Sequence, residues 1–250
     1  MSNSNFWTPP KSFLDFLKIL LLARWRSLFL LLLGVAVPLL VFEQLAIVIW
    51  QNKSSFPWDE PILLAIHQTV SPQLNAIAVT FTKLGVYQGV FPAATIVAIA
   101  LLYWRRWRSL TYWLVTLLGS VAINRTAKIL LHRVRPSLWD SIVPELDYGF
   151  PSGHAMSSMS FVTALVILTW STRWYWPVLL SGSLFVLAIG WTRLYLGVHF
   201  PSDVLAGWMV SLAWAIGVSL VIRPYLAKPS LVSEEALTMA EEKAAEMEQV

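Results

Sequence analysis

Long apolar runs alternate with short polar segments along most of this chain. The runs that we interpret as membrane spans are residues 27–50, 88–104, 110–123, 155–170, 175–191 and 204–222. Several are shorter than the roughly 20 residues that cross a hydrocarbon core, so we expect flanking turns to complete them. The pattern predicts an all-α fold, a bundle of six transmembrane helices.

The segments between and around these runs divide the chain into three parts. Residues 1–26 form a cytoplasmic segment in which Ser12 and Asp15 are spaced as a capping box, so 12–26 is either an interfacial helix or simply the start of the first span. Residues 27–224 form the six-span domain, with short external helices expected between 51 and 87. Residues 225–250 are an acidic cytoplasmic tail.

Composition supports a membrane protein. Hydrophobic residues make up 57% of the chain and charged residues only 13%, against about 25% charged in an average soluble domain. The mean hydropathy is +0.63. Tryptophans stand at several span ends, as at membrane interfaces. The first run is longer than a signal-peptide core, so we expect it to remain as a span. The chain has no cysteine, which excludes disulfides and thiolate chemistry.

The basic residues are distributed unequally among the loops between the predicted spans. They are not gathered on one soluble face, so no nucleic-acid partner is expected. A cytoplasmic N-terminus places most of them inside, as the positive-inside rule prefers, and puts both termini in the cytoplasm. The exceptions are Arg125, Lys128, Arg133, Arg135 and Arg193. Since charge beside a span is costly, we expect these five to serve chemistry on the external or periplasmic face.

The first polar cluster holds two of these cations. Lys128 and Arg135 lie seven residues apart, which on a continuous helix is two turns, so the sequence predicts that both project from one helix face. Pro136 would then end that helix. A polar outer loop follows.

The second cluster is Pro151-Ser152-Gly153-His154, directly before an apolar run. Ser152 is a preferred N-cap residue and Gly153 lets the backbone approach a ligand closely. A helix that begins here points free N–H groups outward and can bind an anion beside His154.

The third cluster places Pro201 in the first turn of a helix, with His199 just before it and Asp203 inside it. Asp203 can accept a hydrogen bond from one ring nitrogen of His199 and leave the other nitrogen free to attack. His154 is then the natural general acid for a leaving oxygen.

Three cations complete this arrangement. Lys128, Arg135 and Arg193 would hold the equatorial oxygens of a phosphoryl group, because phosphoryl transfer depends mainly on positioning and charge stabilisation. Taken alone, each cluster is an ordinary helix cap or local hydrogen bond. Together on one membrane face they indicate a site.

Other residues leave alternatives open. Two histidines and an aspartate can bind zinc, but three permanent cations would repel a divalent ion, so we expect neither metal nor cofactor. Glu43 either pairs with a basic residue of the site or reaches interfacial water. We interpret His67 as interfacial and His132 as structural.

The three clusters resemble the signature motifs of the type 2 phosphatidic acid phosphatase (PAP2) and vanadium haloperoxidase superfamily. K-x6-R-P matches residues 128–136, P-S-G-H matches 151–154, and S-R-x5-H-x3-D matches 192–203 with Thr192 in place of serine. Residues 82–85 also resemble an upstream T-x-L-G feature. The resemblance implies a six-helix membrane fold and metal-independent hydrolysis through a phosphohistidine, with His199 as nucleophile and His154 as acid.

These observations predict a membrane enzyme that hydrolyses a lipid phosphomonoester or diphosphate at the outer face. Phosphatidic acid is the first expected substrate, undecaprenyl or another isoprenyl diphosphate a close second, and phosphatidylglycerol phosphate is also in the set. The alternatives are a vanadate-dependent haloperoxidase, a lipid phosphotransferase, and a non-catalytic lipid-binding or transport protein. The oligomeric state is left open.

Overall fold

The computed structural model describes Ser12, Trp25, and residues 28–52 and 56–224 of the chain. These residues are all-helical wherever their structure is regular, as predicted. The elements are a π-helical turn η1 (Leu32–Ala36), α2 (Val37–Asn52), α3 (Asp59–His67), α4 (Pro72–Leu84), α5 (Val90–Tyr103), α6 (Trp107–Leu131), α7 (Gly153–Thr169), α8 (Tyr175–Tyr195) and α9 (Pro201–Ile222).

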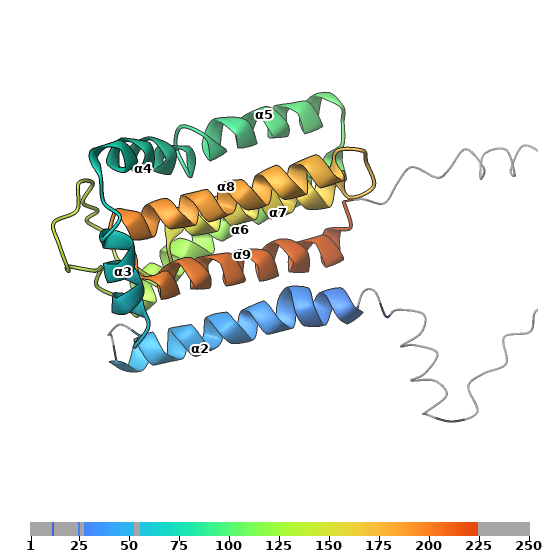
Figure 1. Ribbon diagram of the computed structural model, residues 1–250. Coiled ribbons are helices and arrows are strands. Elements are labelled where there is room, and N and C mark those ends of the chain that lie inside the picture. Colours follow the sequence, from blue (N-terminus) through green and yellow to red (C-terminus); the bar gives the residue numbers. More distant parts are fainter. Residues whose placement is uncertain (1–11, 13–24, 26–27, 53–55, 225–250) are drawn as a thin grey trace, which may run out of the picture.

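The long helices run side by side along one direction (Figure 1). Helix α7 lies at the centre, packed against α6, α8 and α9, while α2 packs on α9 and α5 packs on α6. Small residues permit this close packing. A Cβ atom on Gly182 of α8 would lie 2.5 Å from Val162 of α7, so a side chain there would force the two helices apart.

The outer surfaces of these helices are apolar. Leu118 of α6, Leu184 of α8 and Ile96 of α5 each expose about two thirds of their surface, at 65%, 68% and 67%. Exposed apolar area on this scale matches a lipid environment. The chain is therefore an integral membrane protein with multiple apolar helices.

Four of the predicted spans are long and apolar enough to cross a bilayer: Leu28–Asn52, Trp107–Leu131, Tyr175–Tyr195 and Pro201–Ile222. Helices α5 and α7 have 14 and 17 residues, which at about 1.5 Å per residue fall short of the roughly 30 Å hydrocarbon core. The count of six spans thus stays a prediction.

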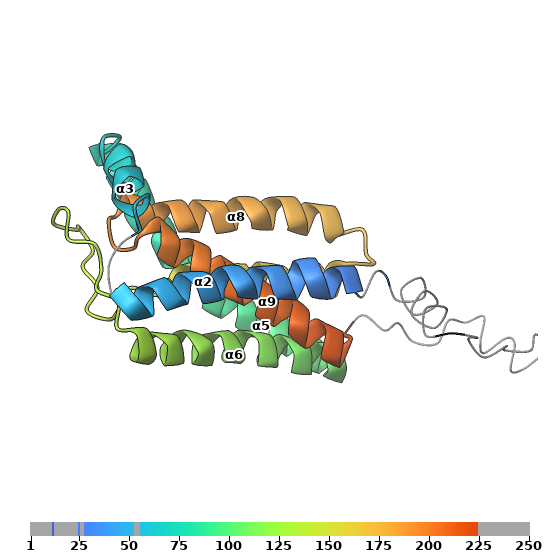
Figure 2. The same ribbon diagram turned by 90° about the horizontal axis from the view of Figure 1, so that it is seen from below.

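Helices α3 and α4 follow α2, and the short α3 lies crosswise at one end of the bundle (Figure 2). Ser71 caps α4 by accepting a hydrogen bond from the backbone N–H of Leu74 at 3.3 Å. The end of α8 is joined to α4 by Tyr195, whose hydroxyl donates to Asn75 at 2.8 Å.

One predicted helix is shorter than expected. Helix α6 ends at Leu131, and His132 adopts the left-handed conformation with φ of 50°. The chain continues from there without helix, so the prediction that Lys128 and Arg135 share one helix face was wrong. Apart from Ser12 and Trp25, the predicted interfacial helix at 12–26 lies outside the described residues, and so does the acidic tail.

The connectivity brings the polar clusters to one end of the bundle. Helices α6 and α8 finish there and α7 and α9 begin there, together with α3 and the loop from 132 to 152 (Figure 1). The three clusters of the sequence therefore meet, although they are separated by up to 75 positions.

Candidate active site

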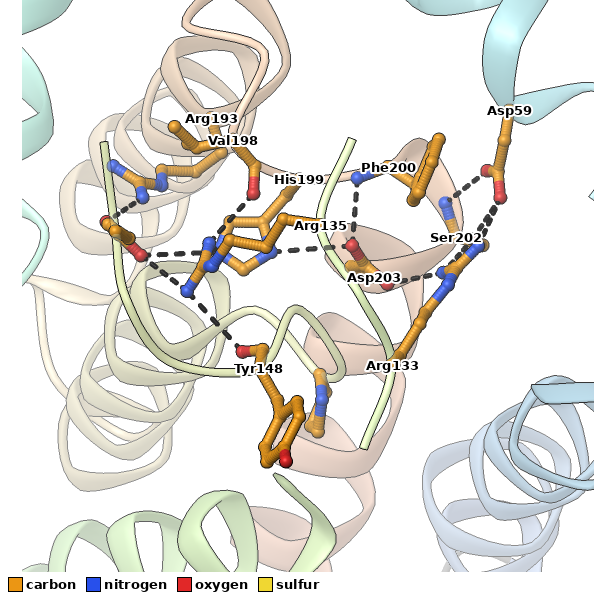
Figure 3. Close-up of polar contacts among 12 residues, drawn as sticks. Asp59, Arg133, Arg135, Tyr148, Arg193, Val198, His199, Phe200, Ser202 and Asp203 are labelled. Carbon is orange, nitrogen blue, oxygen red and sulfur yellow. Dashed lines mark hydrogen bonds and ion pairs between the residues drawn. The ribbon is translucent and has the colours of Figure 1, made fainter. Parts of the chain in front are cut away.

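The nucleophile candidate His199 lies in the loop between α8 and α9 and is fully buried. Its Nε2 atom is 2.9 Å from Nη1 of Arg135, and its Nδ1 atom is 3.4 Å from a carboxylate oxygen of Asp203 (Figure 3). An arginine has only donors, so Nε2 must be the acceptor in this contact. The neutral ring then carries its proton on Nδ1, toward Asp203.

The electrostatic environment keeps this ring neutral. Burial lowers the pKa of His199 well below its usual 6.5, and the charges of Arg135, Arg193, Lys128 and His154 lower it further. An unprotonated imidazole has a lone pair to offer, as covalent catalysis requires.

Asp203 is held from two sides. Its Oδ2 atom accepts a hydrogen bond from the backbone N–H of Phe200 at 2.8 Å, and its Oδ1 atom forms an ion pair with Arg133. The helix that begins at Pro201 places this carboxylate in its first turn, as predicted. The spacing also brings it to the ring of His199, although at 3.4 Å the contact is longer than an ordinary hydrogen bond.

The three predicted phosphate-binding cations come together around His199. Arg135 donates to the carbonyl oxygen of Val198 at 2.8 Å and so lies directly against the His199 loop. Arg193, buried near the end of α8, donates to the hydroxyl of Thr82 at 2.6 Å. Lys128, in the last turn of α6, is also buried. Thr82 belongs to the upstream T-x-L-G feature.

Two loop carboxylates neutralise these cations. Glu145 bridges Arg135, at 2.6 Å, and Arg193, and its Oε2 atom lies 3.9 Å from Nε2 of His199. Asp147 pairs with both Lys128 and Arg135. Burial acts to raise the pKa of Asp147, but hydrogen bonds from Lys128 and Arg135 together with their charges lower it overall. The sequence predicted a polar outer loop near the lipid headgroup here, but no pairing of its carboxylates with the cations.

The second cluster begins α7. Gly153 is its first residue and Ser152 is its N-cap residue. The predicted capping hydrogen bond from the helix to the Ser152 hydroxyl is absent. This hydroxyl is buried and has no hydrogen-bond partner among the described residues. Instead, the backbone N–H of Ser152 donates to the carbonyl oxygen of Asp203 at 3.1 Å, which ties α7 to α9. His154, in the first turn, lies within electrostatic reach of Arg193 and the other two cations.

Three further functional candidates had no specific role assigned from the sequence. Asp59 of α3, Arg133 and Ser202 form a fully buried polar network beside Asp203. Arg133 was marked by its departure from the positive-inside rule, without an assigned role. Asp59 carried no signal beyond its place at the start of a short helix.

The remaining candidates lie apart from the site. Arg125 is exposed on α6, and Glu43 is exposed on α2 and forms no ion pair with a cation of the site in the described part of the chain. His67 stacks on Trp139 at 3.9 Å, and His132 meets Tyr148 edge to face. Both histidines have aromatic partners rather than positions beside His199.

Fold and site together define a class of protein. It is a membrane-embedded helical protein in which one end of the bundle gathers a buried neutral imidazole, a second histidine and three cations, a donor set suited to a phosphoryl group.

Comparison with known proteins shows which family of that class this chain resembles. The sequence model of the PAP2 superfamily matches residues 109–225, a segment that contains all three polar clusters. Over this segment the chain is similar to the PAP2 superfamily, and its homologues are membrane phosphatases of that family, which hydrolyse phosphate esters.

Individual relatives agree. The chain is 29% identical over 160 residues to phosphatidylglycerophosphatase B of Bacillus subtilis (strain 168), covering 62% of this chain and 78% of that protein. It is 27% identical over 157 residues to an undecaprenyl-diphosphatase of Sulfolobus acidocaldarius, covering 60% and 70%. The crystal structure of a transmembrane PAP2 type phosphatidylglycerolphosphate phosphatase from Bacillus subtilis matches with a TM-score of 0.68 and 26% identity, over 78% of this chain and 98% of that chain.

Proposed function

We propose that this chain hydrolyses the terminal phosphate of a membrane lipid, with phosphatidylglycerol phosphate and undecaprenyl diphosphate as the first substrates to test. The sequence alone favoured phosphatidic acid. The relatives reported above are named for the other two lipids, and they support placing those two ahead of it. All three substrates carry a terminal phosphate on an apolar chain.

The observation that carries this proposal is the position of Glu145. Its carboxylate bridges Arg135 and Arg193 within 3.9 Å of the His199 Nε2 atom, so an anionic group of phosphate-like charge already has a place beside the nucleophile. A substrate phosphate would replace Glu145 and Asp147 on the cations. Arg135 would then release Nε2 and turn its donors to the phosphate oxygens.

The chemistry follows from this placement in two steps. The Nε2 lone pair of His199 forms a bond to phosphorus while the ester or anhydride P–O bond breaks and His154 gives a proton to the leaving oxygen. A water molecule then attacks the phosphohistidine, loses a proton to His154, and frees His199 with release of inorganic phosphate. Asp203 stabilises the Nδ1–H form throughout, and Lys128 adds a third positive charge.

The free N-terminus of α7 has a supporting role. The buried hydroxyl of Ser152 has no hydrogen-bond partner in the described part of the chain and lies beside Gly153, where helix N–H groups are exposed to a ligand. A helix start of this kind favours anions. We propose that Ser152 and Gly153 bind a phosphate oxygen there.

We also propose the topology that the loop charges predict. Six helices cross the membrane, with α5 and α7 completed by adjacent turns, both termini lie in the cytoplasm, and the site opens to the external or periplasmic face. A lipid headgroup would reach the site from the bilayer while its acyl or prenyl chains stay between lipids.

The test is phosphate release by the purified full-length protein in detergent micelles. The panel contains phosphatidic acid, phosphatidylglycerol phosphate and undecaprenyl diphosphate, each assayed with the wild type and with His199→Ala. We expect release by the wild type alone, with full activity in excess EDTA. Wild-type protein that releases no phosphate from any of the three lipids would contradict the proposal, and dependence on an added divalent metal would contradict the mechanism.

A further inference from the structure

A second group of charges lies behind the nucleophile, on the side away from the phosphate-binding cations. Arg133 donates to Ser202 at 2.7 Å and to Asp59 at 2.7 Å, and forms an ion pair with Asp203. Each of these four residues has no exposed surface. Figure 3 shows the group as a continuous row of contacts from His199 through Asp203 and Arg133 to Asp59.

The row constrains Asp203 completely. One carboxylate oxygen is fixed by Arg133 and the other by the backbone N–H of Phe200, so the plane of the carboxylate cannot turn away from the Nδ1 atom of His199. The guanidinium of Arg133 also lies 4.5 Å from the ring centre of Phe200, which limits its own movement.

Asp59 fixes Arg133 in turn. Its Oδ2 atom accepts hydrogen bonds from Arg133, from the Ser202 hydroxyl at 2.6 Å and from the backbone N–H of Phe56 at 2.9 Å. Its Oδ1 atom accepts from the backbone N–H of Ser202 at 2.9 Å. One carboxylate thus joins the start of α3 to the first turn of α9, two elements 143 positions apart.

We propose that Asp59 and Arg133 are a positioning pair for the phosphatase reaction, which hold Asp203 so that the Nε2 atom of His199 is aimed at phosphorus. The pair touches neither substrate nor the reacting atoms and acts through Asp203. Two carboxylates share one guanidinium here, so Asp203 keeps an incompletely neutralised charge toward the ring of His199. This inference rests on the proposed function.

The experiment distinguishes an effect on the orientation of His199 from an effect on phosphate binding. The variants Asp59→Ala and Asp59→Asn are compared with the wild type for kcat on phosphatidylglycerol phosphate, or on whichever lipid of the panel the wild type hydrolyses. Inhibition by inorganic phosphate, which the cations bind, and by orthovanadate, which mimics the five-coordinate transition state, is measured alongside. The matched control is Glu43→Gln, which removes an exposed carboxylate outside the network.

We expect kcat of Asp59→Ala to fall about 10- to 100-fold, by analogy with residues that orient metal-binding side chains through hydrogen bonds. The inhibition constant of phosphate stays within about threefold, since Lys128, Arg135 and Arg193 are untouched, whereas that of vanadate rises by the same factor as kcat falls. Asp59→Asn, which keeps an oxygen for Arg133, has a smaller effect. Glu43→Gln behaves as wild type.

Conservative replacement of Arg133 gives an independent reading. Arg133→Lys keeps the charge beside Asp203 and is expected to retain more kcat than Arg133→Gln. If Asp59→Ala is not obtained folded, Asp59→Asn and Arg133→Lys report the same ratio of phosphate to vanadate inhibition. A kcat for Asp59→Ala within twofold of wild type overturns the inference, and so does a parallel rise of both inhibition constants. If the wild-type protein itself releases no phosphate from any of the lipids, that result contradicts the proposed function rather than this inference.

Discussion

Two groups of ion pairs flank His199, and they differ in what supplies the negative charge. Behind the ring, Arg133 is paired with Asp59 and Asp203, both in the first turns of helices and both without exposed surface. In front of it, the proposed phosphate-binding cations are paired with Glu145 and Asp147, whose side chains are 24% and 45% exposed in an irregular loop. The rear pairs are enclosed by the fold, whereas the front carboxylates reach solvent and, in the proposed mechanism, give up their places to the substrate phosphate.

The difference indicates how one small region can be both rigid and open. A buried charge needs its partner at all times, because an unpaired ion in a dry site is very costly. A cation whose partner is a partly exposed carboxylate can exchange that partner for another anion at less cost, since the displaced carboxylate returns to water. His199, the proposed nucleophile, lies between these two groups of ion pairs.

The largest expected effect comes from removing the imidazole of His199, which lies between the two groups of ion pairs. His199→Ala should reduce phosphate release to background, because the proposed covalent intermediate forms on the imidazole of His199. Asp203→Asn should retain a small residual turnover, because Asp203 orients the ring rather than attacking. Initial rates with saturating lipid measure both. Equal losses from the two variants would argue against the separate roles.

The next largest effect is the loss of stability on breaking an ion pair behind His199, compared with one in front of it. Arg133→Met leaves two buried carboxylates unpaired and should cost about 3–5 kcal/mol of stability. Lys128→Met should cost no more than about 1 kcal/mol, because its half-exposed partner Asp147 regains water. Thermal unfolding in detergent, followed by tryptophan fluorescence, ranks the two. Similar losses would mean that the front pairs are as structural as the rear ones.

The pH dependence sharpens the comparison further. Burial first, and then Arg135 and Arg193, lower the pKa of His199, so its ring stays neutral as the pH falls through 6.5. We therefore expect kcat/KM to remain on its plateau at pH 6.5, with the acid limb at lower pH. Arg135→Gln removes one of the causes, which raises the pKa of His199 and moves the acid limb upward. A wild-type limb centred near pH 6.5 would contradict this neutral, buried imidazole.

Local spacing predicted the parts of the site that one helix start determines. Pro201 and Asp203 take their places from the register of α9, and His199 precedes them by a fixed number of residues. The prediction that Lys128 and Arg135 share one helix face was wrong, because the backbone adopts the left-handed conformation at His132. No glycine stands next to His132 in the sequence to indicate such a turn. The two cations still meet, through Asp147.

The rear network could not be predicted in the same way. Asp59 reaches Arg133 and Ser202 across 74 and 143 positions, so its role depends on how α3 packs over the start of α9. A sequence read alone shows a carboxylate near a helix start and nothing more. The lengths of the helices were also hard to predict from the apolar runs. Helix α6 runs from Trp107 to Leu131, well beyond the apolar run at 110–123, whereas α7 is short.

The smallest expected effect tests the exchange of anions at the front. Glu145→Gln removes a carboxylate that competes with phosphate for Arg135 and Arg193, so inorganic phosphate should inhibit more strongly than in the wild type. A partly exposed ion pair is worth about 0.2–1 kcal/mol, which corresponds to a gain in affinity of up to about fivefold. Asp140→Asn, an exposed carboxylate of the same loop, should leave the inhibition constant unchanged. Weaker phosphate binding in Glu145→Gln would mean that Glu145 holds the cations in place for the substrate, and the front group would then be as fixed as the rear one.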